Sequence, residues 1–159
     1  MFKRILVPVD GSPASQQALR IAARMAREAG GQLRLVHVLE DVSYLSGYDP
    51  FGATAGELFR VMRESAARIL SEAQAQARSD GVQADTVLVD ELGKRLDGAV
   101  AEIAAQWQAD LVVVGSHGRR GMSRLMLGSG AEQIIRTAPV PVLVARQPDE
   151  PAPQGAPAT

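Results

Sequence analysis

The chain contains 159 residues, of which 46% are hydrophobic and 22% are charged, a composition typical of one globular domain with a substantial core. Its 17 basic and 18 acidic residues nearly balance, which argues against a nucleic-acid binder. The absence of cysteine excludes disulfide bonds and thiolate zinc sites. No apolar run approaches the roughly 20 residues that cross a bilayer, and too few apolar residues follow the basic start for a signal peptide, so we expect a cytoplasmic protein without a membrane span.

The beginning of the chain predicts two buried strands joined by a helix. Nearly continuous apolar runs at 3–9 and 32–39 are typical of parallel strands that are covered on both faces. Between them, Ser12 as N-cap and Pro13 at the first helical position predict a helix that runs to about residue 29, where two glycines end it.

The next part of the chain predicts a loop, a long helix and an edge strand. Residues 40–53 include two glycines, a proline and both tyrosines, which indicates a long loop that serves either as a lid or only as a flexible connection. Thr54 and Glu57 form a capping box for a helix that reaches about residue 79. The strand at 82–89 alternates apolar and polar residues, which favours a place at the edge of a sheet.

The last part predicts a helix, a strand, a second helix and a final strand. An apolar stripe starting at Leu96 ends with Trp107, which we expect to cover the core, while Gly98 favours a later helix start. The run 111–114 predicts another strand that is covered on both faces, and the apolar segment 140–145 predicts the last strand.

The alternation of strands and helices predicts a single-domain α/β fold at 1–146. Its five parallel strands form a doubly wound, flavodoxin- or Rossmann-like sheet of order 3-2-1-4-5, with its switch point between the first and fourth strands. This order brings Asp10 beside Gly115. The tail at 147–159 contains four prolines and no large apolar side chain, so we expect it to be disordered.

The segment after the fourth strand has the features of a phosphate-binding turn. We interpret Gly115, Gly118 and Gly128 as positions where the backbone approaches a phosphate closely. Ser129 is placed as the N-cap of the next helix and forms a capping box with Glu132, and the helix N-terminus suits an anion. The turn also carries three arginines and no acidic residue: Arg119, Arg120 and Arg124.

This Gly-x2-Gly-x9-Gly-Ser spacing resembles the nucleotide-binding branch of the universal stress protein family, and the resemblance extends over 2–146. It implies a homodimer through strand 140–145 and ATP, ADP or AMP as ligand, with Mg²⁺ bound through the phosphates. The implied nucleoside contacts are Pro8, Val9, Asp10 and Val38. The implied contacts around the phosphates are Gly115, Gly118, Gly128, Ser129, Gly130 and Ala131. Val114 and Arg120 are further predicted nucleotide contacts, although the arginines are also consistent with a solvated surface loop.

Two positions depart from the family pattern, and several roles stay open. Family members commonly have a side chain where Gly130 stands and a hydroxyl residue where Ala131 stands, so one phosphate hydrogen bond is expected to be missing. Asp10 is equally consistent with a turn carboxylate that caps the first helix, and His117 with a surface loop residue. His37 is interpreted as a packed residue of its strand.

The chain lacks the signatures of other nucleotide-binding or hydrolytic classes. It has no Gly-x4-Gly-Lys-Ser/Thr, no Gly-x-Gly-x-x-Gly after the first strand and no Gly-x-Ser-x-Gly. Two histidines also make a transition-metal site unfavourable. The leading hypothesis is therefore a stress-response regulator controlled by ATP. The alternatives are an interaction module of the same fold without nucleotide, and a slow ATPase whose general base is Asp10 or His117.

Overall fold

The computed structural model describes residues 2–40, 53–117 and 127–146, with only the backbone at 53–55. Five parallel strands form one sheet in the order β3-β2-β1-β4-β5. This arrangement confirms the predicted doubly wound α/β fold and the edge position of the third strand. The strands are β1 (Arg4–Pro8), β2 (Gln32–Val38), β3 (Ala84–Val89), β4 (Leu111–Gly115) and β5 (Val142–Ala145).

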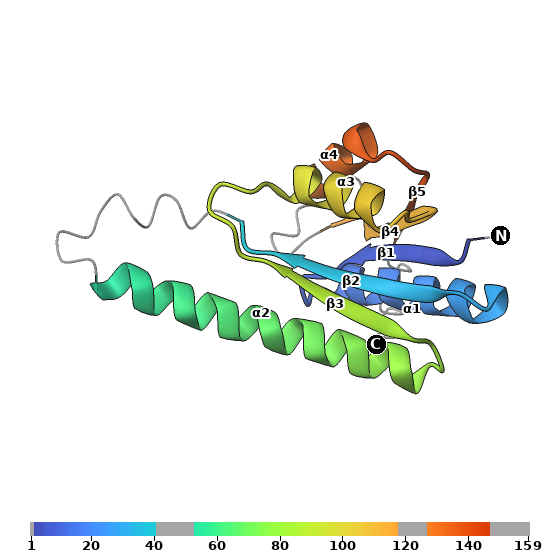
Figure 1. Ribbon diagram of the computed structural model, residues 1–159, viewed down its shortest axis with the longest axis horizontal. Helices are drawn as coiled ribbons and strands as arrows, with labels where there is room; N and C mark the ends of the chain where they lie inside the picture. Colours follow the sequence, from blue (N-terminus) through green and yellow to red (C-terminus); the bar gives the residue numbers. More distant parts are fainter. Residues whose placement is uncertain (1, 41–52, 118–126, 147–159) are drawn as a thin grey trace, which may run out of the picture.

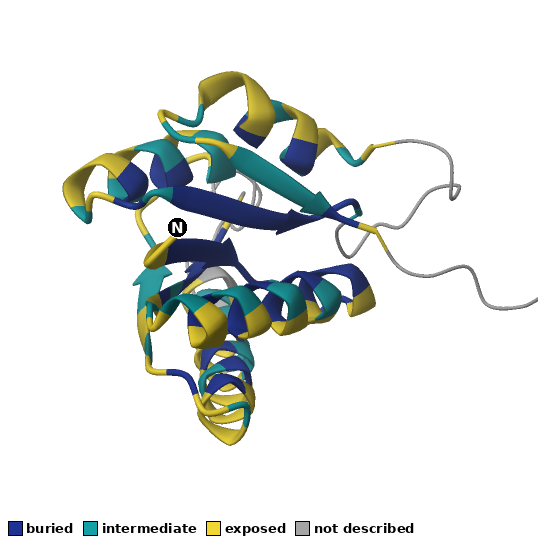
Figure 2. Ribbon diagram, turned by 90° about the vertical axis from the view of Figure 1, so that its right-hand side faces the viewer, coloured by how far each residue is buried: buried dark blue, intermediate teal, exposed yellow. Residues whose placement is uncertain are grey.

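Two helices cover each face of the sheet (Figure 1). On one face, α1 (Pro13–Ala29) and α2 (Ala53–Ser79) enclose a core with β-strand residues such as Ile5 and Leu35. On the other face, α3 (Leu96–Gln106) and α4 (Ser129–Thr137) enclose a second core with Leu6 and Val112. Buried helix faces point toward the sheet and exposed faces point outward (Figure 2). The apolar runs therefore form strands that are covered on both sides, as their sequence predicted.

The first helix begins and ends as its sequence predicts. The Ser12 hydroxyl accepts a hydrogen bond from the Ser15 N–H at 3.2 Å, and Pro13 occupies the first helical position. Gly30 ends the helix with φ +63°, a left-handed conformation that favours glycine. These two local signals fix the length of α1 without help from distant residues.

Three predicted boundaries are wrong by a few residues. Helix α2 begins at Ala53, so Thr54 lies inside it rather than at its N-cap, and the Glu57 carboxylate pairs with Arg60. Strands β3 and β5 begin two residues later than predicted, at Ala84 and Val142. Thr and Glu three residues apart also occur inside helices, where they lie on the same face. This spacing alone therefore does not identify a helix start.

Helix α3 begins at Leu96 rather than after Gly98. The Glu40 carboxylate, from the chain beyond β2, accepts a hydrogen bond from the Leu96 N–H at 2.8 Å. The side chain of Leu96 also packs against the second core. These contacts hold the first turn in place despite the glycine. At the other end of α3, Trp107 packs against the same core as predicted, with the Arg34 guanidinium 4.7 Å from its ring centroid.

Candidate functional site

The candidate site lies at the carboxyl edge of the sheet, between β1 and β4. These strands are neighbours, with Ile5 opposite Leu111 and Leu6 opposite Val112. The chain leaves β1 toward α1 on one face and leaves β4 toward α4 on the other (Figure 1). Such a divergence opens a crevice at the strand ends, which is where open α/β sheets bind ligands.

Asp10 lies in the turn that joins β1 to α1. One of its carboxylate oxygens accepts a hydrogen bond from the Ser12 N–H at 2.8 Å, and its own N–H approaches the Ser15 hydroxyl at 3.4 Å. Gly11 completes the turn with φ +80°. The carboxylate therefore supports the turn, in agreement with the interpretation of Asp10 as a turn carboxylate. Its second oxygen makes no hydrogen bond within the part of the chain that the structure describes.

Gly115 has a packing role that needs no ligand. A Cβ atom on this residue would lie 2.6 Å from the carbonyl carbon of Ala14 and 2.9 Å from the nitrogen of Ser15. The end of β4 thus touches the backbone of the first turn of α1 directly. Only glycine permits this contact, so the residue is explained by helix–strand packing, and its role at a phosphate stays a prediction.

The segment between β4 and α4 is closed by a backbone hydrogen bond. The Gly128 N–H donates to the Ser116 carbonyl at 2.7 Å, and the Ser116 N–H donates to Ala145 at 2.9 Å. The end of β4 and the start of α4 are thereby held together. The predicted contacts Gly118 and Arg120, with Arg119 and Arg124, lie outside the described residues.

The described residues supply no side-chain cap at the start of helix α4. Its N-cap is Gly128 rather than Ser129, and no described side chain accepts a hydrogen bond there, so the predicted capping box is wrong. The Glu132 carboxylate instead pairs with Arg136, one turn further on, at 2.7 Å. The N–H groups of Ser129, Gly130 and Ala131 donate to no residue that the structure describes. Together with the helix dipole, they form a set of donors suited to an anion.

The two departures from the family pattern are both explained by packing against α3. A Cβ atom on Gly130 would lie 3.0 Å from Cδ2 of Leu96, so Leu96 takes up the space that a side chain would use. Ala131 is buried in the second core. The backbone donors at these positions are unaffected, because both departures concern side chains.

The predicted nucleoside contacts reach the site in different ways. Val9 and Val114 are only 5% and 6% exposed and belong to the cores, so they present backbone rather than side chain to a ligand. Pro8 is buried too, at the end of β1, whereas Val38 is half-buried at the end of β2. His37 is buried with its Nδ1 atom 2.6 Å from the Val9 carbonyl, which confirms that it is a packed residue.

The sequence also did not indicate the environment of His117. Its Nδ1 atom lies 2.9 Å from the Ser116 hydroxyl, and its Nε2 atom is buried without a hydrogen-bond partner among the described residues. A histidine after a strand could equally have been solvated. No pattern in the sequence distinguishes the two cases.

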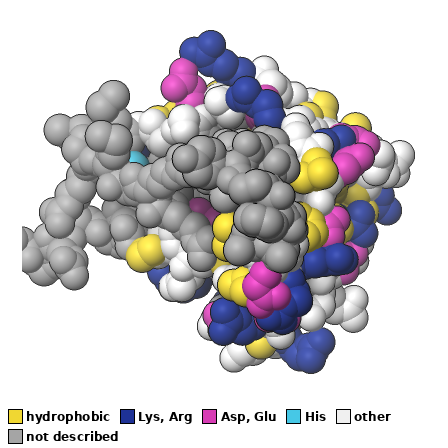
Figure 3. Space-filling model, turned by 90° about the vertical axis from the view of Figure 1, so that its left-hand side faces the viewer, with side chains coloured by type: hydrophobic (Ala, Val, Ile, Leu, Met, Phe, Trp, Pro, Cys, Tyr) yellow, Lys and Arg dark blue, Asp and Glu magenta, His cyan; other side chains and the backbone are white. Residues whose placement is uncertain are grey.

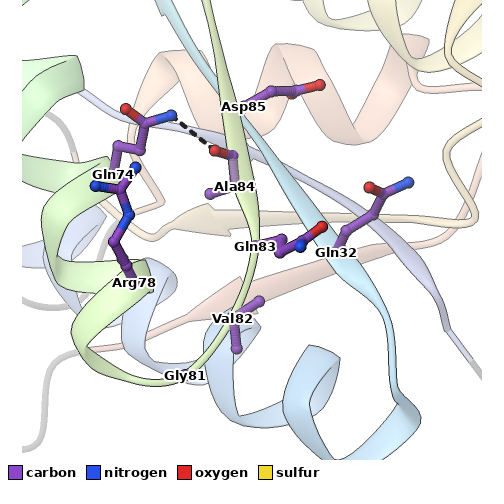
Figure 4. Close-up of a pocket in the computed structure, with 8 residues that line it drawn as sticks. All are labelled: Gln32, Gln74, Arg78, Gly81, Val82, Gln83, Ala84 and Asp85. Atoms are coloured by element: carbon purple, nitrogen blue, oxygen red, sulfur yellow. Dashed lines mark hydrogen bonds between the residues drawn. The ribbon is translucent and has the colours of Figure 1, made fainter.

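Described residues line two hollows, of which the larger lies away from this crevice and the smaller reaches the β1–α1 turn at Val9 and Gly11. One of about 460 Å³ lies at the amino end of β3, with Gln74 and Arg78 on one side and Gln32 and Gln83 on the other (Figure 4). The other, of about 210 Å³, lies between α1 and α2. Of the predicted site residues, only Val9 lines either hollow.

The end of the molecule that carries the site has no dominant charge on its described surface. Basic and acidic side chains are interspersed there (Figure 3). Among the described residues, no group of three His, Asp or Glu could hold a metal ion, and no helix is long and apolar enough to span a membrane.

These features define the class: a doubly wound α/β protein whose switch point carries an uncapped helix N-terminus. The chain belongs to the universal stress protein family, whose model matches residues 1–146. A universal stress protein of Methanocaldococcus jannaschii, MJ0531, is 32% identical over 149 residues, which cover 93% of this chain and 84% of the relative. A solved family member from Burkholderia pseudomallei is 30% identical with a TM-score of 0.71, over 90% of this chain and 95% of that one.

Two more distant solved structures share the fold and were determined with nucleotides. A universal stress protein in complex with cAMP is 24% identical with a TM-score of 0.63, over 91% of this chain and 97% of that one. The Archaeoglobus fulgidus protein in complex with dAMP is 23% identical with a TM-score of 0.63, over 91% of this chain and 98% of that one.

Proposed function

We propose that this universal stress protein binds ATP, or ADP or AMP, at the carboxyl edge of its sheet and acts in the stress response as a nucleotide-controlled dimeric regulator. The observation that carries the proposal is the uncapped start of α4, held against the end of β4 by the Gly128 to Ser116 hydrogen bond. The N–H groups of Ser129, Gly130 and Ala131 would receive phosphate oxygens there. The complexes of relatives with cAMP and dAMP support an adenine nucleotide as the ligand class.

The described residues fit such a ligand in two further respects. Asp10 has a carboxylate oxygen without a partner in the described part of the chain, and a ribose hydroxyl could donate to it. The backbone of Val9 and the half-buried Val38 would face the nucleoside, as the family resemblance implies. Mg²⁺ would be held by the phosphates and water with few protein ligands, as is common for this ion.

A second function, an interaction module without nucleotide, is favoured by the packing of two glycines. Gly115 is explained by its contact with the backbone of Ala14 and would stay glycine even without a phosphate, and a Cβ atom on Gly130 would lie close to the side chain of Leu96. We rank this function second, because packing does not account for the missing side-chain cap at Gly128.

The proposed homodimer would use the outer edge of β5. Among the described residues this strand pairs only with β4, so its other edge would offer backbone donors and acceptors to a second copy. Val142, Leu143 and Val144 are only half-buried, and Ile135 on the adjacent α4 is 44% exposed. An apolar edge of this kind invites pairing, so we place the interface at 140–145.

A variant with a lysine in the proposed interface tests the dimer. Val142→Lys introduces a charge that pairing of the two β5 edges would bury, so the variant should sediment as a monomer while the wild type sediments as a dimer. Thr86→Lys places the same charge on β3, the opposite edge strand, and should leave the dimer intact. A Val142→Lys variant that remains dimeric places the interface elsewhere.

The test of the nucleotide proposal is whether the purified protein holds adenine nucleotide. Heat or acid denaturation should release ATP, ADP or AMP that chromatography can identify. If the protein is purified empty, added ATP should raise its melting temperature, because a ligand that binds only the folded state stabilises it. If denaturation releases no nucleotide and millimolar ATP does not raise the melting temperature, the interaction module is favoured.

A further inference from the structure

The hollow of about 210 Å³ between α1 and α2 lies on the face of the sheet that these two helices cover (Figure 1). Small residues line it from both sides and leave this space open: Gly11 and Ser15 at the start of α1, and Ala73 on α2. Of the predicted nucleotide contacts, only Val9 lines the hollow, and the other lining residues continue along the two helices. The hollow is therefore a feature distinct from the switch point.

The floor of the hollow is apolar. Val9 and Leu19 are 5% and 3% exposed, and Ala73 and the partly buried Ile69 close the floor from the side of α2. Moving an apolar group from water onto such a surface is favourable. An engineered apolar cavity of about 150 Å³ holds a benzene molecule, so this hollow has room for an aliphatic side chain of similar size.

The rim of the hollow is polar and carries one charge of each sign. Arg20 lies on α1 and Glu72 on α2, and both side chains are exposed. Arg20 donates from Nε and Nη2 to the side-chain oxygen of Gln17, at 3.1 and 2.8 Å. Among the described residues, Arg20 pairs with no carboxylate and Glu72 with no basic group. The hollow thus separates two opposite charges that do not neutralise each other.

The charges on the rim differ from those elsewhere on α2. Further toward the start of that helix, the Arg60 guanidinium pairs with the carboxylates of Glu57 and Glu64. Arg20 and Glu72 both remain available to a ligand. A ligand that matches the hollow has a carboxylate for Arg20, an ammonium group for Glu72 and a small apolar group for the floor. An aliphatic amino acid combines these three groups in one molecule.

We propose that the hollow between α1 and α2 binds an aliphatic amino acid. Its carboxylate contacts the Arg20 guanidinium, its ammonium group contacts the Glu72 carboxylate, and its side chain packs on Leu19 and Ala73. This second site does not rest on the proposed function, because neither charged residue lies at the switch point. Its test therefore remains valid whether or not the protein binds nucleotide.

Titration of the full-length protein with L-leucine tests the site. Leucine should cause saturable shifts at lining backbone amides such as Ser15, Gln16 and Gln76 in a nitrogen–proton correlation spectrum. Ala73→Leu places a side chain in the hollow and should abolish these shifts. Ala75→Leu adds the same side chain at an exposed position of α2 and should leave them unchanged. Thermal melts without leucine confirm that both variants are folded.

Two results of this titration overturn the proposal. One is the absence of saturable shifts in the wild type up to the solubility limit of leucine. The other is wild-type leucine affinity in folded Ala73→Leu, since the ligand would then bind elsewhere. If Ala73→Leu does not fold, variants of the two rim charges decide instead, because both side chains are exposed and their loss leaves the packing of the helices unchanged.

The rim charges are tested with two leucine derivatives. Leucinamide lacks the carboxylate, and N-acetylleucine lacks the ammonium group, so the wild type should bind leucine about 2- to 5-fold more tightly than either, the range for an exposed charge pair. Arg20→Gln should remove the preference over leucinamide, and Glu72→Gln should remove the preference over N-acetylleucine. Arg24→Gln, one turn further along α1 and outside the hollow, should preserve both preferences. Equal affinity of the wild type for all three compounds, or preferences that survive in both rim variants, overturns the assignment.

Discussion

The starts of α1 and α4 lie at the same edge of the sheet but differ in how their N–H groups are satisfied. At α1, the Ser12 hydroxyl accepts from Ser15, and the Asp10 carboxylate accepts from Ser12. At α4, the N-cap is a glycine, and no side chain from the described residues takes that place. Among the described residues, the chain closes the start of α1 with its own oxygens but not the start of α4, which under the proposed function binds phosphate oxygens.

Helix α3 strengthens this comparison. Its first N–H, on Leu96, donates to the Glu40 carboxylate, which comes from a residue 56 positions earlier in the chain. The starts of α1 and α3 thus both have an internal acceptor. The account predicts that α4 differs because its acceptor is a ligand, and changes at each helix start can test that difference.

The largest expected effect concerns the contact between the end of β4 and the start of α1. Gly115→Ala should destabilise the fold by about 3 kcal/mol, because the new Cβ would overlap the backbone of Ala14, where neither element can yield easily. Chemical denaturation measures the change. As a control, Gly98→Ala adds the same atom in α3, where nothing lies within 4 Å, and should stabilise the protein by up to about 1 kcal/mol.

Equal stability changes in these two variants would show that the close packing of Gly115 does not contribute to the stability of the fold. The glycine would then need another explanation, and direct approach to a phosphate would become the favoured one.

A second prediction converts the start of α4 into one like that of α1. Gly128→Asp supplies a side-chain acceptor and a negative charge at the N-cap, where φ of −63° suits any residue. Without ligand, the variant should be slightly more stable, by a few tenths of a kcal/mol, because Asp is only modestly better than Gly as an N-cap. Its affinity for ATP should fall about 10-fold, because the carboxylate competes with phosphate for the same donors.

Gly128→Ser is the neutral control for that experiment and should lose less ATP affinity than the Asp variant. Titration calorimetry and thermal melts measure both quantities. Unchanged ATP affinity in Gly128→Asp would mean that the phosphates do not lie at the start of α4.

The smallest expected effect comes from removing the side-chain N-cap of α1. Ser12→Ala removes the acceptor of the Ser15 N–H and should cost about 1 kcal/mol of stability, the usual value for a lost N-cap. Affinity for ATP should stay within about threefold, because the phosphates are not expected at this helix. A large loss of ATP affinity without a loss of stability would reverse the comparison between the two helix starts.

Local signals in the sequence predicted the fold well. Apolar runs such as 111–114 identified strands covered on both faces, and Ser12, Pro13 and Gly30 marked the ends of α1. These features depend on residues that are neighbours along the chain. The alternation of strands and helices then restricts the strand order to few choices, and the predicted order is the observed one.

The site was predicted less completely, because its details depend on residues that are distant in the chain. The Ser129 to Glu132 spacing indicated a capping box, but the spacing cannot show that the helix already includes Ser129. A glycine indicates a close approach without naming the partner, so the contact of Gly115 with α1 was not foreseen. The contact of Glu40 with Leu96 has no local pattern at all.

The most direct test of the central claim compares ATP with adenosine at the backbone amides of the two helices. In nitrogen–proton correlation spectra of the full-length protein, the difference between the shifts caused by ATP and by adenosine isolates the effect of the phosphates. The account predicts that this difference is largest at Ser129, Gly130 and Ala131 and small at Ser15 and Gln16 of α1. A difference that is largest in α1, or absent from the start of α4 while ATP is bound, would contradict the account.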